Sequence, residues 1–223
     1  MTQDSSPIAP RRRRLTPLLF VAGLASAVVL SLSMTNTLSA FTAAITNTIN
    51  TAASGTYVLT ETGPSGGSTV TCNSTDGGSV STNAFNCATI NKYGGGTVMV
   101  PTDVAGTSNL ATTTVTFQNT GTATATTFVL TPGACTQSTN GGSNGTATDF
   151  CSKLNVVITS NGTPVRNTTA AALAADGAIT LPTVPAPGGA AVTFVFTVSI
   201  DNSAGNTYQG LAASQPLTWT LAS

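Results

Sequence analysis

The chain contains no histidine, and this absence excludes several kinds of chemistry. Without an imidazole there is no Ser-His or Cys-His nucleophile pair, no HExxH zinc site and no histidine general base. The cysteines form no CxxC pair, so a thiolate metal site is not expected either. Carboxylate pairs can hydrolyse glycosides, but the acidic residues are scattered singly along this sequence. We therefore expect no catalytic residue, no cofactor and no bound metal.

Charged residues are also rare, at 6% of the chain. Four of the basic residues are the run Arg11–Arg14, which leaves Lys92, Lys153 and Arg166 as the remaining cations. Nucleic acid binding needs clustered basic side chains that neutralise phosphates, and no such cluster follows the N-terminal run. We therefore expect no nucleic acid partner. No LPxTG motif is present, so covalent attachment to a cell wall by a sortase is not expected.

The N-terminal segment has the pattern of an export signal. Arg11–Arg14 precede a largely apolar run from Leu15 to Met34, and the small residues Thr37 and Ser39 follow at the −3 and −1 positions. This pattern predicts cleavage by a signal peptidase between Ser39 and Ala40. The alternative is a retained membrane anchor, because the run approaches the ~20 apolar residues of a spanning helix. Both interpretations place the protein outside the cytoplasm, with membrane contact only through an uncleaved signal segment.

The cysteine count supports the same location. An even number of cysteines in an exported chain indicates disulfides, and four cysteines allow three connectivities. Local pairing is the economical solution, because each bond would close a loop of about 15 residues and stabilise the fold by ~3 kcal/mol. The local pairs are Cys72 with Cys87 and Cys135 with Cys151.

Apolar residues that recur at every second position predict an all-β fold. The strongest strand runs from Val192 to Ile200, and Leu154–Ile158 is a strand that ends at an Asn-Gly hairpin turn. Thr114–Gln118 and Thr126–Thr131 are expected to pair as antiparallel neighbours around a glycine-containing loop. Leu217–Leu221 is expected to be the last strand. The remaining predicted elements are strands at Thr56–Thr60, Thr69–Cys72, Thr97–Val100 and Ala178–Thr183, and one short helix at Thr168–Ala175.

Many short strands separated by turn residues indicate an antiparallel β-sandwich of the jelly-roll kind. Trp219 alternates with Leu217 and Leu221, so core packing is its expected role rather than sugar binding. Three parts of the chain are expected, namely a signal segment at 1–39, an N-terminal arm at 40–50 and a β-sandwich at 51–223.

The arm has one apolar face. Phe41, Ala43, Ile45 and Ile49 share this face of an extended chain, and only Asn47 interrupts it. One interpretation is that the arm is the first strand of its own sandwich. The other is that it leaves its own domain and completes the sheet of a neighbouring copy. The residues alone leave both interpretations open.

Several stretches, in the same order along the chain, resemble the TasA/camelysin family. The stretches are Thr37-Leu38-Ser39-Ala40-Phe41-Thr42, Ala52 to Leu59, Thr116 to Gly121, Phe150 to Ile158, Asn206 to Gly210 and Leu217-Thr218-Trp219. The resemblance implies a dedicated signal peptidase and a jelly-roll subunit of secreted fibres, in a biofilm matrix or on a bacterial cell surface. It also implies that the arm of one subunit adds as a strand to the next, which favours the exchanged arm.

Strand donation is physically reasonable because an open sheet edge has unpaired backbone groups that a donated strand can bond. Head-to-tail donation does not close on itself, so it propagates as a filament. The expected partners are further copies of the chain and a minor accessory fibre subunit. The alternative functions are a monomeric surface adhesin or binding module, and a camelysin-like surface peptidase. The lack of histidine argues against the peptidase.

Overall fold

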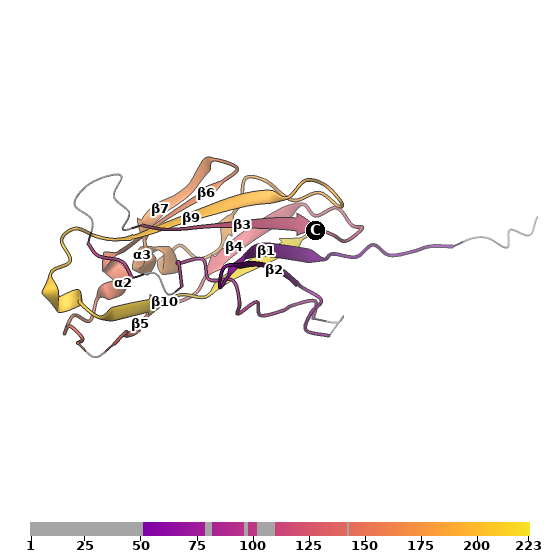
Figure 1. The fold of residues 1–223 in the computed structure, drawn as a ribbon. Helices are drawn as coiled ribbons and strands as arrows, with labels where there is room; N and C mark the ends of the chain where they lie inside the picture. The colour runs from indigo at the N-terminus through magenta and orange to yellow at the C-terminus, as the bar shows by residue number, and fades with distance from the viewer. Residues whose placement is uncertain (1–50, 79–81, 96–97, 102–109, 142) are drawn as a thin grey trace, which may run out of the picture. The chain divides into compact units, whose positions relative to one another are not determined.

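The residues that the structure describes form eleven strands, which are grouped into three antiparallel sheets (Figure 1). A computed structural model describes residues 51–78, 82–95, 98–101, 110–141 and 143–223. The expected signal segment, its cleavage site at Ser39 and Ala40, and the arm residues Phe41, Ala43, Ile45 and Ile49 lie outside the described residues. The segment Ala53–Ser223 forms one compact unit, which contains all the strands.

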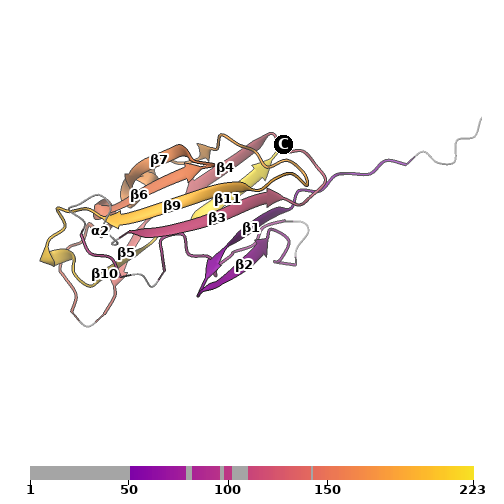
Figure 2. The ribbon, with the colours of Figure 1, turned by 45° about the horizontal axis from the view of Figure 1, so that its top comes forward.

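The larger sheet has six strands in the order β2-β1-β3-β9-β6-β7, which Figure 2 shows side by side. Its members are β1 (Leu59–Ser65), β2 (Ser68–Asn73), β3 (Ala111–Asn119), β6 (Leu154–Ser160), β7 (Thr163–Thr169) and β9 (Val192–Ile200). The central strands β3, β6 and β9 alternate strictly between buried and less buried residues. Apart from Asn119 at the end of β3, the buried residues are apolar or small, and threonines dominate the other face of β3. The period-two pattern of the sequence therefore corresponds to one covered face and one open face.

The second layer is formed by shorter strands. β4 (Thr127–Pro132) pairs with β8 (Ile179–Thr180) on one side and with β11 (Leu217–Ala222) on the other. β5 (Thr136–Thr139) pairs with β10 (Leu211–Ser214). The two pairs follow each other along the chain, and the Gly133 N–H donates to the Pro216 carbonyl at 2.8 Å between them. The segment from Leu211 to Ala222 is therefore one extended edge that Pro216 interrupts, since proline has no N–H to donate.

An aromatic cluster holds the two layers together. Phe117 on β3 and Phe194 on β9 face Phe128 on β4 and Trp219 on β11. The Phe117 and Trp219 ring centroids are 4.1 Å apart, and those of Phe117 and Phe128 are 5.6 Å apart. Because these rings come from both layers, they form the sandwich-like core.

Short helices and a defined turn complete the unit. The helical elements are α2 (Phe150–Lys153), α3 (Ala170–Ala175) and the 3-10 turn η2 (Asn206–Tyr208). α3 confirms the predicted helix, and the Thr169 hydroxyl caps it by accepting from the Ala172 N–H at 3.2 Å. The predicted hairpin at Asn161-Gly162 is confirmed, with φ angles of 47° and 81° that suit a type I′ turn.

The strands predicted at Val192–Ile200, Thr69–Cys72 and Leu217–Leu221 are also confirmed. The predicted pairing of the two strands around Asn119-Thr120-Gly121 is wrong, because β3 pairs with β1 and β9 and β4 lies in the other layer. Buried Asn119 stabilises the crossing between layers. Its Nδ2 donates to the Ala123 carbonyl, and its Oδ1 accepts from the Gly121 N–H.

Three other predicted strands differ from the structure. The first strand starts at Leu59 rather than Thr56, because the backbone of Thr56 and Val58 bonds to the loop around Thr120 and Thr122. β8 covers only two residues of the strand predicted at Ala178–Thr183, since Pro182 cannot extend the ladder. The predicted strand at Thr97–Val100 is not formed by Val98–Val100, whereas Thr97 lies outside the described residues.

Candidate functional site

The edge from β10 to β11 is the most distinctive functional feature of the fold. β11 pairs with β4 and β10 pairs with β5, and no described strand pairs with their other side. Such an edge presents backbone N–H and C=O groups that a further strand can bond. The described part of the molecule therefore contains an open template for strand addition.

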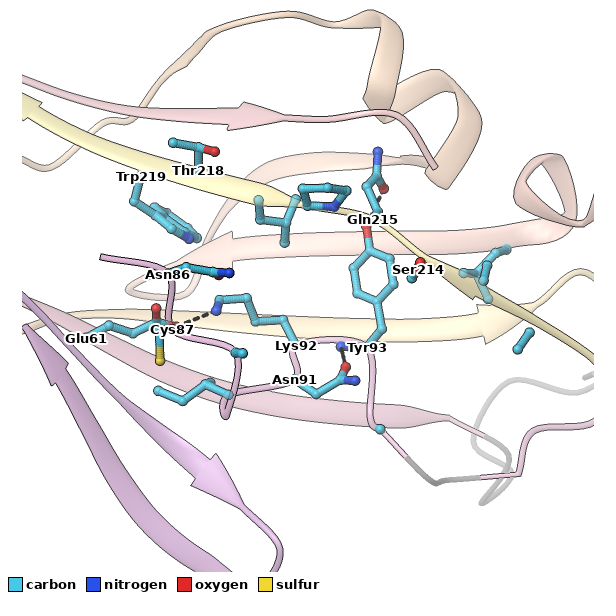
Figure 3. Close-up of a pocket in the computed structure, with 18 of the residues that line it drawn as sticks. Glu61, Asn86, Cys87, Asn91, Lys92, Tyr93, Ser214, Gln215, Thr218 and Trp219 are labelled. Atoms are coloured by element: carbon cyan, nitrogen blue, oxygen red, sulfur yellow. Dashed lines mark hydrogen bonds and ion pairs between the residues drawn. The ribbon is translucent and has the colours of Figure 1, made fainter. Parts of the chain in front are cut away.

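A cavity of about 1330 Å³ runs along this edge, and we call it the β11 groove (Figure 3). One wall is the segment from Leu211 to Leu221, and the other includes β1 and residues of the segment 82–101. Phe117 lies among the lining residues, so the groove reaches the aromatic core. The groove thus combines an unpaired backbone edge with an apolar floor.

Trp219 belongs to both the core and the groove. Its ring packs against Phe117 and Phe194, with centroid distances of 4.1 and 4.8 Å, which agrees with the predicted core role. The same side chain lines the groove and is only partly buried as a whole. Its Nε1 atom is enclosed, and no acceptor among the described residues bonds to it. An enclosed N–H without an acceptor costs about 1–3 kcal/mol, so the groove holds an unused donor.

A buried ion pair is the only charged feature among the described residues that line the groove. Glu61 on β1 faces Lys92, whose Nζ lies 2.5 Å from Glu61 Oε1. The side chains are 9% exposed for Lys92 and 11% exposed for Glu61. Burial raises the pKa of Glu61, and the charge and hydrogen bond of Lys92 lower it by less. The pair ties the segment 82–101 to the larger sheet, but its charges are incompletely compensated.

Tyr93 joins the same segment to the edge strand. Its hydroxyl donates to Gln215 Oε1 at 2.6 Å, and Figure 3 shows its ring reaching toward Gln215. Gln215 in turn donates to the carbonyls of Gly133 and Ala170, at 2.8 and 3.1 Å. Burial raises the pKa of the Tyr93 phenol well above its usual range. Tyr93 is therefore a neutral structural link at the point where Pro216 interrupts the edge.

Apolar side chains are exposed at the rim of the groove. Phe85, Val98 and Val100 are 45%, 81% and 49% exposed, and all three line the cavity. Soluble proteins rarely gather large apolar side chains on an open surface without a partner. The rim therefore adds to the apolar surface that an occupant of the groove would cover.

Both predicted disulfides are present. Cys72 on β2 is bonded to Cys87 in the segment 82–101, and Cys135 is bonded to Cys151 in α2. The local pairing is thus confirmed. Cys72 and Cys87 line the groove, so the first disulfide holds one of its walls in place. Two disulfides are compatible with an extracellular protein.

The described acidic residues have structural partners. Asp149 accepts a hydrogen bond from the Tyr208 hydroxyl at 2.7 Å, which raises the pKa of Tyr208. Asp176 pairs with Arg166 at 3.0 Å, and Asp201 accepts from Ser203, which lowers the pKa of Asp201. Within the described ranges, no group of histidine, cysteine or acidic side chains is placed to hold a metal ion. No helix in those ranges is long and apolar enough to cross a membrane.

The chain on the N-terminal side of the sandwich is solvent-exposed. Residues 51–56 are all exposed and belong to no strand. The backbone first bonds to the sandwich at Thr56, where the Thr56 carbonyl accepts from the Thr122 and Ala123 N–H groups. Gly121 allows this close approach, because an added Cβ would lie 2.2 Å from the Thr56 oxygen. Residues 51–56 are therefore an exposed stretch that separates the sandwich from residues 40–50 in the sequence.

No protein-family model matches the chain, and a search of curated proteins finds no significant match.

Sequence reasoning found some components of this site and missed others. The alternation of Leu217, Trp219 and Leu221 predicted the last strand but not its place at a sheet edge, and the cysteine count predicted the disulfides. The sequence did not indicate the Glu61–Lys92 pair, because the two residues come together only in the folded chain. The one available signal was that Glu61 and Lys92 are charged residues in a sequence with almost no charge.

Proposed function

We propose that the chain is a secreted structural subunit of extracellular fibres, which assemble head to tail by strand donation. In this proposal, residues 40–50 of one copy occupy the β11 groove of the next copy. The observation that carries the proposal is the open edge of β10 and β11 above an apolar groove. The arm would supply the missing backbone partner, and its apolar face would cover the floor.

The lengths of the two partners agree. An extended strand rises ~3.3 Å per residue, so residues 40–50 span roughly 35 Å and the edge from Leu211 to Ala222 spans roughly 40 Å. The exposed residues 51–56 separate the arm from the sandwich and act as a tether. An arm of this length can therefore cover most of the edge.

The chemistry of the arm also fits the groove. Residues 40–50 have no charge, and the two charged residues of the groove already pair with each other. Burial of a large apolar side chain contributes about 1.5–3 kcal/mol, so Phe41 and Ile45 are the expected anchors. The donated strand gains affinity from backbone pairing and apolar contact rather than from charge attraction.

The finer fold and the family are part of the same proposal. We assign the sandwich to the jelly-roll kind and the chain to the TasA/camelysin group. The crossing connections support the jelly-roll kind: apart from the hairpins β1–β2 and β6–β7 and the step from β4 to β5, the chain alternates between the two layers from β3 to β10. The partners that follow are a signal peptidase, further copies of the chain and a minor accessory subunit, in a biofilm matrix or on a cell surface.

No catalytic activity is part of the proposal. The described carboxylates serve structural contacts, and the chain has no histidine. A monomeric adhesin or binding module would use the same groove for a foreign ligand. The experiment below therefore includes the monomer as an outcome.

The test replaces two anchors with charge. The double variant Phe41→Asp with Ile45→Asp should remain folded and form no filaments, because a carboxylate enters an apolar groove only at high cost. Circular dichroism measures the fold, and light scattering with electron microscopy measures assembly. The matched control is Thr42→Asp with Thr46→Asp, on the opposite face of the arm, which should retain filaments.

Three outcomes would contradict the proposal. If the wild-type protein stays monomeric at all concentrations, the binding-module function is favoured. If the double variant unfolds, the arm is a strand of its own domain. If filaments persist in the double variant, the arm does not drive assembly.

A further inference from the structure

Apolar burial alone cannot set the register of the donated arm. The residues on its apolar face recur at every second position, from Phe41 through Ile45 to Ile49. A slip of two residues along the groove keeps the same face inward, so several registers bury similar apolar side chains. Asn47 is the one polar residue on that face. It is therefore the only position on this face that can distinguish one register from another by polarity.

Glu61, Lys92 and Trp219 Nε1 all line the groove, and we call these three groups the polar patch; the Tyr93 hydroxyl and Gln215 are further polar groups there and bond to each other. The two charged side chains are about nine-tenths buried, and Trp219 Nε1 has no acceptor among the described residues. The Lys92 ammonium has three donors, and it pairs with Glu61. Figure 3 shows Trp219 reaching from β11 and Lys92 with Glu61 from the opposite wall.

A carboxamide suits this patch because it both accepts and donates. The Oδ1 atom of asparagine can accept from Trp219 Nε1, and its Nδ2 atom can donate to the Glu61 carboxylate. Residues that lie directly opposite in paired strands share one face, so Asn47 would lie opposite Trp219. Ile45 and Ile49 then lie opposite Leu217 and Leu221, whichever direction the arm takes. This register places the two isoleucines that flank Asn47 against apolar neighbours.

We propose that Asn47 of the donor arm sets its register by bonding to the Glu61–Lys92–Trp219 patch of the acceptor copy. This inference rests on the proposed function. A slip of two residues would place the carboxamide against Leu217 or Leu221 and leave both Asn47 and Trp219 Nε1 unpaired. Unpaired buried polar groups are unfavourable, so one register dominates.

The first test determines the register directly by cryo-electron microscopy of filaments. Wild-type filaments should show one register, with residue 47 opposite Trp219. The Asn47→Leu variant should still form filaments, but with arms in registers that differ by two residues. The matched control Thr48→Leu changes the opposite face of the arm and should keep the single wild-type register.

The second test measures the critical concentration for assembly. Asn47→Ala and Trp219→Phe should each raise it by roughly tenfold or more, since each removes a buried hydrogen bond. The double variant should raise it by less than the product of the two single effects, because both changes remove the same contact. Thermal unfolding monitored by circular dichroism controls for any loss of domain stability in the Trp219 variant.

The outcomes separate this inference from the proposed function. The role of Asn47 would be overturned if Asn47→Leu filaments showed only the wild-type register. It would also be overturned if wild-type filaments placed another residue opposite Trp219. Both results would leave strand donation intact. Multiplicative effects in the double variant would also overturn it. If wild-type protein forms no filaments, strand donation and the role of Asn47 are both overturned.

Discussion

Removal of the Lys92 charge is expected to destabilise the domain strongly at neutral pH and weakly in acid. Lys92 Nζ lies 2.5 Å from Glu61 Oε1, and both side chains are largely buried. At an effective dielectric constant near 20, the attraction is roughly 5–7 kcal/mol, and the desolvation of two charges offsets most of it. Removing one partner leaves the other charge buried and unpaired. Lys92→Met should therefore cost about 3–5 kcal/mol at pH 8.

The pH dependence follows from the direction of the pKa shift. Burial raises the pKa of Glu61 above its unfolded value, so the folded state favours the protonated carboxyl. The Glu61 contribution to stability is greatest below the unfolded pKa of about 4.3 and falls as pH rises through the folded pKa. Loss of Lys92 raises the Glu61 pKa further. The cost of Lys92→Met should therefore shrink as pH falls toward 4, where a neutral Glu61 needs no cation.

The assay is urea unfolding monitored by the fluorescence of Trp219, the only tryptophan in the chain. Measurements are made at concentrations where light scattering detects no assembly. The control is Glu61→Leu with Lys92→Met, which removes both charges and should be within about 1–2 kcal/mol of wild type or more stable. The coupling of Glu61 and Lys92 would be refuted if Lys92→Met cost less than about 1 kcal/mol at pH 8. It would also be refuted if the double variant lost as much stability as the sum of the two single variants.

Three further predictions concern export, disulfides and catalysis. N-terminal sequencing of the secreted protein should begin at Ala40, and a mature form that retains the apolar run would identify an anchor instead. Thiol titration of the denatured, unreduced protein should find no free thiol, and two or more free thiols would contradict the two disulfides. The double variant Cys135→Ser with Cys151→Ser should lower the free energy of unfolding by ~3 kcal/mol. Purified protein should leave casein intact with or without a chelator, because no imidazole is available; chelator-sensitive cleavage lost on changing Glu61 would overturn this.

Local patterns in the sequence predicted several of the individual strands. β9 and β11 follow from alternation, because one face of each strand packs against the core. The β6–β7 hairpin follows from Asn161 and Gly162, which readily adopt positive φ angles. These features depend on near neighbours, so the sequence contains the information directly.

The layer assignment and the candidate site depend on long-range packing instead. β3 and β4 look like a hairpin in sequence, but β3 already has a partner on each edge. The groove forms because the second layer ends at β11, and no local pattern indicates where a sheet ends. The Glu61–Lys92 contact joins β1 to a segment 31 residues later, so neither residue type nor spacing could predict it.

The most direct test of strand donation uses the same single tryptophan. Arm insertion between copies changes the surroundings of Trp219 in the β11 groove, so its emission should shift as concentration rises. If strand donation occurs, this shift should coincide with the increase in light scattering and should be absent in Phe41→Asp with Ile45→Asp. A shift that does not depend on concentration would show that the arm occupies the groove of its own chain. Filament growth with no change in Trp219 emission would contradict donation into this groove.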